Sequence, residues 1–133
     1  MRSDELQHLD FSLHEAPLRG GGTEITVFGE LDLANAGKLR AALERALGGE
    51  GDVVIDMRAC AFIDSSGVGA LAGVALRLDE QRRHLLLRGV RERVLKTFRI
   101  AGLTAHSSLT VEPYTDAHGA EADPGSRANA DSG

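Results

Sequence analysis

Cysteine and aromatic residues are scarce in this chain of 133 residues, and each shortage excludes a class of structure. Cys60 is the single cysteine, so the chain cannot form an internal disulfide or a zinc site built from several cysteines. Tryptophan is absent, and the aromatic residues are one tyrosine and four phenylalanines, so we expect an aliphatic core. The length corresponds to one domain.

Long apolar runs are also missing. The first ten residues contain no apolar stretch of the kind that a signal peptide needs. The longest uncharged apolar run, Ser65–Leu76, is far shorter than the ~20 residues of a membrane span. We therefore expect a reduced cytoplasmic protein without a membrane partner.

The charge is mildly acidic, with a formal net charge of −5. An acidic chain with so few aromatic side chains is a poor candidate for binding nucleic acid. Residues 77–111 are the exception, with 8 basic and 3 acidic side chains, and they form either a solvated helix face or a patch that faces a partner. No histidine pair has the spacing of metal ligands, and no phosphate-binding loop with its lysine is present. We predict no cofactor, no metal and no catalytic activity.

The hydrophobic pattern begins with a hairpin. Phe11–His14 and Thr23–Phe28 read as strands, and the consecutive glycines of Arg19–Gly22 supply the backbone conformations that a turn requires. Helices and strands then alternate, with buried strands predicted over Asp52–Met57 and Leu85–Leu87. The helices follow Asp32, Ser65 and Arg91, and a last short strand is predicted at Leu109–Val111.

The predicted order is β-β-α-β-α-β-α-β. Alternating strands and helices favour parallel pairing, so we predict an α/β fold with a mostly parallel sheet and an antiparallel N-terminal edge strand. The domain is expected over residues 10–112. Residues 113–133 are small, polar and acidic, and we expect a flexible tail there.

Function in such a fold is expected where strands end and helices begin. Asp32 is predicted to cap one helix, and Ser66 is predicted to use its hydroxyl to cap another. Gly67, Gly69 and Gly73 fall in the first turns of that second helix. Because glycine costs up to ~1 kcal/mol in a helix, we expect something to pack closely against this backbone, either another part of the fold or a partner.

Four segments together resemble the STAS domain family, and more narrowly its bacterial anti-sigma factor antagonists. The segments are Gly29–Asp32, Val54–Met57, Phe62–Gly69 and Phe98–Leu103. The resemblance implies that Ser65, directly after Asp64, is phosphorylated by an anti-sigma factor with serine kinase activity. It also implies that a PP2C-type phosphatase restores the unphosphorylated form. That form would bind the anti-sigma factor and so release a sigma factor.

The resemblance further implies a partner-binding surface and a monomer or weak dimer. The residues of this surface are Asp32, Asp64, Ser66, Gly67, Val68 and Gly69. STAS domains also serve as soluble subunits of lipid-transport or other regulatory complexes without obligatory phosphorylation, and this alternative stays open. A serine hydrolase is disfavoured, because no Gly-x-Ser-x-Gly motif surrounds Ser65.

Overall fold

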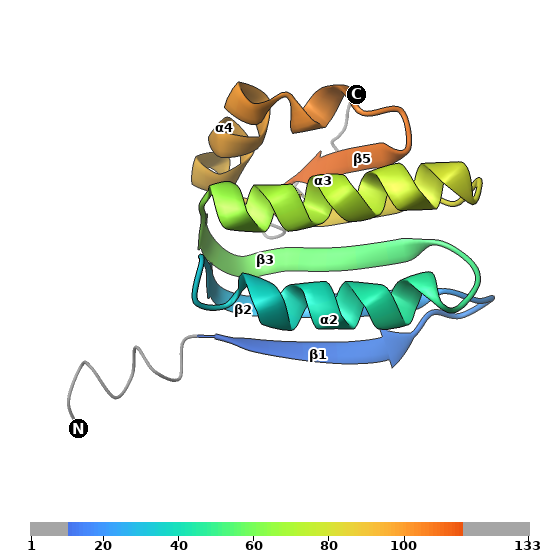
Figure 1. The fold of residues 1–133 in the computed structure, drawn as a ribbon. Coiled ribbons are helices and arrows are strands. Elements are labelled where there is room, and N and C mark those ends of the chain that lie inside the picture. The colour runs from blue at the N-terminus through green and yellow to red at the C-terminus, as the bar shows by residue number, and fades with distance from the viewer. Residues whose placement is uncertain (1–10, 116–133) are drawn as a thin grey trace.

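Five strands form one sheet in the computed structural model, which describes residues 11–115. Three α-helices and one short 3₁₀-helix join these strands in the predicted order (Figure 1). The elements are β1 (Ser12–Pro17), β2 (Thr23–Leu31), α2 (Ala36–Leu47), β3 (Val53–Ile63), α3 (Ser65–Glu80), β4 (Leu85–Val90), α4 (Glu92–Ala101), η1 (Leu103–Ala105) and β5 (Leu109–Pro113). No helix within these residues combines the length and the apolar composition needed to cross a membrane.

The strands lie in the sheet in their order along the chain. β1 and β2 are antiparallel, which confirms the predicted hairpin. All later neighbours are parallel, so the predicted α/β class with one antiparallel edge strand is confirmed. The two strands predicted to be buried pair directly, with Val53 opposite Leu85 and Ile55 opposite Leu87.

The core lies between the sheet and the helices. α2 and α3 lie side by side across one face of the sheet, and α4 lies beyond α3 on the side away from α2 (Figure 1). The predicted inward residues of α3 and α4 are all buried, which confirms the helical phase. These residues are Val68, Leu71, Ala75 and Leu78 in α3, and Val94, Leu95 and Phe98 in α4.

β2 and β3 are longer than the hydrophobic pattern predicts. β3 continues from Met57 to Ile63 because β2 also continues, to Leu31, and pairs with it through two register shifts. Cys60 lies in this continuation and is fully buried. Burial raises the pKa of the Cys60 thiol to about 11, so this cysteine is a packing residue rather than a reactive one.

The described chain continues slightly beyond residue 112. Pro113 ends β5, and the Tyr114 N–H donates to the Val90 carbonyl at 2.7 Å. The guanidinium of Arg91 lies 4.0 Å from the centre of the Tyr114 ring. The flexible tail is predicted over residues 113–133. Most of it, residues 116–133, lies outside the described residues.

Candidate functional site

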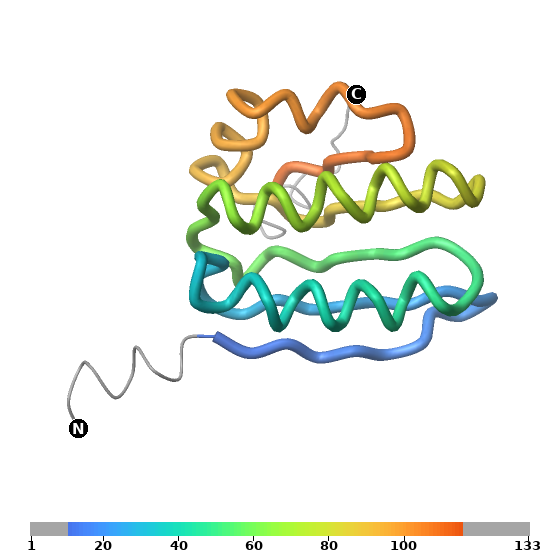
Figure 2. The backbone as a smooth tube through the Cα atoms, viewed as in Figure 1, coloured from blue at the N-terminus to red at the C-terminus, as the bar shows by residue number. Residues whose placement is uncertain are grey.

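The two predicted junctions meet at one edge of the sheet. Because β2 and β3 are parallel neighbours, they end side by side, with Leu31 opposite Ile63 (Figure 2). The Asp64 N–H donates to the Leu31 carbonyl at 3.1 Å, and the Leu33 N–H donates to Asp64 Oδ2 at 3.1 Å. The structure thus brings together the loops that carry Asp32 and Asp64.

Asp64 is the N-cap of α3. Its Oδ1 accepts hydrogen bonds from the Ser66 N–H at 2.8 Å and the Gly67 N–H at 3.3 Å. These are two of the N–H groups that a helix start leaves without an internal partner. Since Oδ2 binds the Leu33 loop, one carboxylate fixes both the start of α3 and the loop beside it.

Two capping predictions are wrong. Ser66 contributes its backbone N–H to the cap rather than its hydroxyl, because the Asp64 carboxylate already fills that position. Asp32 does not cap α2, since this helix starts only at Ala36, with Asn35 as its N-cap residue. The Asp32 carboxylate instead closes the turn before the helix by accepting from the Asn35 N–H at 3.2 Å.

Ser65 is the first residue of α3 and is exposed, whereas Ser66 is half-buried. Within residues 11–115, neither hydroxyl has a side-chain or backbone hydrogen-bond partner, and no histidine forms a hydrogen bond with either serine. The Ser65 hydroxyl is therefore free to be modified, but it has no base to activate it. The arrangement suits an acceptor of a phosphate better than a nucleophile for hydrolysis.

The remaining residues of the predicted surface differ in accessibility. Gly67 and Val68 are buried, and Gly69 is exposed. A Cβ atom at Gly67 would lie 2.6 Å from Ile63 Cγ1 and 2.9 Å from Leu31 Cγ, so the expected close packing is confirmed there. At Gly73 nothing lies within 4 Å of the Cβ position, so no part of the described chain packs closely there, and close packing of a partner against Gly73 stays a prediction.

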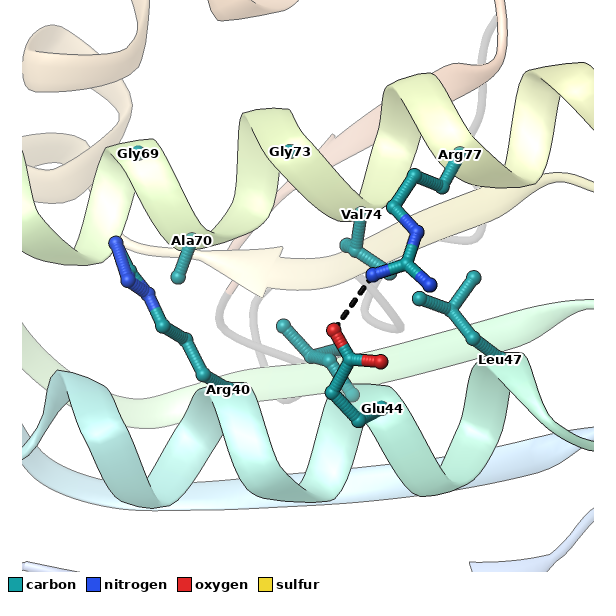
Figure 3. A pocket seen from close by; sticks show the side chains of 9 residues that line it. Arg40, Glu44, Leu47, Gly69, Ala70, Gly73, Val74 and Arg77 are labelled. Atoms are coloured by element: carbon teal, nitrogen blue, oxygen red, sulfur yellow. Dashed lines mark hydrogen bonds and ion pairs between the residues drawn. The ribbon is translucent and has the colours of Figure 1, made fainter.

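Gly69 and Gly73 instead border a groove of about 200 Å³ between α2 and α3 (Figure 3). Its apolar lining is Leu43, Leu47, Ala70 and Val74, and its charged lining is Arg40, Glu44 and Arg77. Arg77 and Glu44 form an ion pair at 2.6 Å across the groove. Among the described residues, no three histidine, cysteine, aspartate or glutamate side chains are grouped so as to hold a metal ion.

The sequence analysis did not identify Leu33 as a candidate. Leu33 is 78% exposed and its backbone N–H donates to Asp64, so the loop bound to the N-cap residue of α3 carries an exposed apolar residue. A large apolar side chain in the short turn between Asp32 and Asn35 is the signal that would have pointed to it.

Substitutions at Asp64 are expected to separate its two structural contacts. Asp64→Ala loses both and is expected to lower the free energy of unfolding by about 1–2 kcal/mol. Asp64→Asn keeps one oxygen, which can cap α3 as well as aspartate does, but its amide nitrogen cannot accept from the Leu33 N–H. Urea unfolding should therefore rank stability as wild type, then Asp64→Asn, then Asp64→Ala, with faster hydrogen exchange of the Leu33 amide in both variants. Equal stability of the two variants would contradict the assigned contacts.

The sequence matches the STAS domain family over residues 15–117. The chain is 35% identical over 82 residues to an anti-sigma-B factor antagonist of Listeria monocytogenes, covering 61% of this chain and 72% of the relative. It is 30% identical over 81 residues to an anti-sigma-B factor antagonist of Staphylococcus aureus, covering 60% of this chain and 75% of the relative.

Two solved structures share the fold. The Bacillus cell fate determinant SpoIIAA in its phosphorylated form superposes with a TM-score of 0.62 at 22% identity, covering 84% of this chain and 98% of that one. An anti-sigma factor antagonist from Mycobacterium paratuberculosis superposes with a TM-score of 0.67 at 20% identity, covering 84% and 92%. With the family match over residues 15–117, the sheet and the helices are those of a STAS domain, and this chain belongs to the STAS domain family.

Proposed function

We propose that this protein is an anti-sigma factor antagonist that Ser65 phosphorylation switches off. In the unphosphorylated form it binds an anti-sigma factor in the cytoplasm and so releases a sigma factor. The anti-sigma factor carries the serine kinase activity, and a PP2C-type phosphatase removes the phosphate. The chain itself acts by binding and performs no catalysis.

One observation carries the proposal: Ser65 is exposed at the capped start of α3, its hydroxyl is unengaged, and the loop bound to the N-cap residue Asp64 carries the exposed Leu33. Leu33 offers a partner an exposed apolar contact, and the Asp64 carboxylate holds the backbone N–H of this residue. The relatives in Listeria monocytogenes and Staphylococcus aureus, both named as anti-sigma-B factor antagonists, support the same role.

The chemistry of a phosphate explains how binding would be switched. Phosphorylation adds about −1.5 to −2 charges at pH 7, directly after Asp64 in the chain. A partner that packs on Leu33 would then have to remove water from this charge, which is costly unless the partner supplies a cation. The helix dipole favours an anion here by only ~0.3–1 kcal/mol, so the fold tolerates the phosphate while the interface does not.

The test is to map the acceptor while identifying the partner. Tagged wild type, Ser65→Ala and Ser66→Ala are purified from the native cells, the bound proteins are identified, and ATP is added before mass spectrometry. We expect a kinase-type anti-sigma factor in each preparation, and one phosphate on wild type and Ser66→Ala but none on Ser65→Ala.

Two outcomes would contradict the proposal. Phosphate retained in Ser65→Ala and lost in Ser66→Ala would move the switch to Ser66. Recovery of the subunits of a lipid-transport complex, with no phosphate on any variant, would favour the alternative role of a soluble STAS subunit.

A further inference from the structure

We propose that Arg40, on α2, binds the phosphate of phosphorylated Ser65 and so positions it over the groove between α2 and α3. Arg40 is thus a positioning residue for the modified state rather than a contact of the unmodified one. The inference rests on the proposed role of Ser65 as the phosphate acceptor.

The first argument is the place of the guanidinium. Arg40 extends from α2 across the groove, and its Nη2 lies 3.8 Å from the position that a Cβ would take at Gly69 (Figure 3). Gly69 follows Ser65 by four residues, so both lie on one face of α3 with Cβ positions about 5–6 Å apart. The guanidinium therefore stands about one helical turn from Ser65. The arginine side chain and a phosphorylated serine side chain can together span this distance.

The second argument is the open path between the two groups. Helical side chains lean toward the N-terminus of their helix, so a side chain at position 69 would project between Arg40 and Ser65. Gly69 leaves this space empty, and apart from Arg40 nothing in the described chain lies within 4 Å of its Cβ position. No close contact within the described chain therefore requires glycine at position 69. An open route for a phosphate would require it.

The third argument is charge. Within residues 11–115, Arg40 forms no salt bridge, although Arg77, at the other end of the groove, pairs with Glu44 at 2.6 Å. The carboxylate nearest to Ser65 in the chain, Asp64, has its oxygens occupied by backbone N–H groups. A phosphate there would be repelled by Asp64, with Asp32 in the neighbouring loop adding to the negative charge. Arg40 supplies a planar fork of donors that matches phosphate oxygens in pairs.

The experiment places phosphoserine at position 65 during translation, so that neither a kinase nor an anti-sigma factor is needed. Phosphorus NMR then follows the second ionisation of the phosphate, whose ordinary pKa is about 6. We expect the pKa in Arg40→Gln to be higher than in wild type by about 0.5–1 unit, because the nearby cation favours the doubly charged form. Arg40→Lys should recover part of the difference, since it keeps the charge but loses the fork.

Arg77→Gln is the matched control, because it removes an arginine from the same groove at its other end. This variant should titrate like wild type, and the melting temperature of unphosphorylated Arg40→Gln should equal that of wild type. An unchanged pKa in Arg40→Gln, or an equal shift in Arg77→Gln, would overturn the role of Arg40. Either result would leave the proposed antagonist function intact, whereas phosphate mapped to Ser66 in native cells would instead contradict that function.

Discussion

Replacing Ser65 with aspartate is expected to weaken binding to the anti-sigma factor about a thousandfold, which corresponds to a loss of roughly 4 kcal/mol. The new carboxylate stands at an exposed position directly after Asp64, whose own carboxylate holds the backbone N–H of Leu33. A partner that covers Leu33 must desolvate this charge and accept two neighbouring carboxylates of like sign. Calorimetric titration of the anti-sigma factor that co-purifies with Ser65→Ala measures the loss.

Ser65→Asn is the control that separates charge from size, because it has the shape of aspartate without its charge. We expect it to bind within about tenfold of wild type, and we expect Ser65→Ala to bind persistently. Ser65→Asp, Ser65→Asn and Ser65→Ala should all melt close to wild type. The acidic residue of Ser65→Asp is mildly favourable in the first turn of a helix, by ~0.3–1 kcal/mol. If Ser65→Asp and Ser65→Asn bind equally well, charge at this position is not the switch.

The order of elements could be predicted because each buried element carries its own pattern. The β-branched run Val53–Ile55 and the leucines of Leu85–Leu87 indicate strands, and these strands pair as expected, although Leu86 is only half-buried. Likewise, the left-handed conformation of Gly102 at the end of α4 follows from glycine's freedom to adopt positive φ.

Where each helix or strand ends depends on long-range contacts that the local sequence does not reveal. β3 continues through polar and small residues because β2 lies beside it, which is a long-range pairing. Asp32 looks like a helix cap, yet Asn35 takes that place three residues later and Asp32 closes the turn. The carboxylate of Asp64 caps α3, whereas the hydroxyl of Ser66 does not. Aspartate and serine are both common N-cap residues, so propensity alone does not decide between them.

The meeting of the Asp32 and Asp64 junctions at one end of the sheet could be predicted from the sequence, but the residues around them could not. Leu33 and Arg40 come from another loop and another helix, and in the sequence only the apolar character of Leu33 within a turn hints at either of them. The three glycines of α3 look alike in the sequence and differ in space. Gly67 faces the core, whereas Gly69 and Gly73 open onto the groove.

The different surroundings of these glycines predict opposite effects of the same substitution on stability. In Gly67→Ala the added methyl meets Ile63 Cγ1 at 2.6 Å and Leu31 Cγ at 2.9 Å, and both side chains are buried in the core. Since neither can move away freely, we expect the free energy of unfolding to fall by about 1–3 kcal/mol. In Gly73→Ala the methyl meets nothing within 4 Å, so the better helix propensity of alanine should raise stability by up to ~1 kcal/mol.

The consequence of Gly67→Ala reaches the candidate site, because the Gly67 N–H is one of the groups that Asp64 caps. Pushing the first turn of α3 away from β2 and β3 would lengthen that hydrogen bond and displace Ser65. Gly67→Ala should therefore also weaken binding to the anti-sigma factor, while Gly73→Ala keeps the first turn in place. Urea unfolding of both variants, followed by titration with the anti-sigma factor, measures the two effects. Should Gly67→Ala be as stable as Gly73→Ala, Leu31 and Ile63 must yield easily, and their contact with Gly67 is not what holds Ser65 in position.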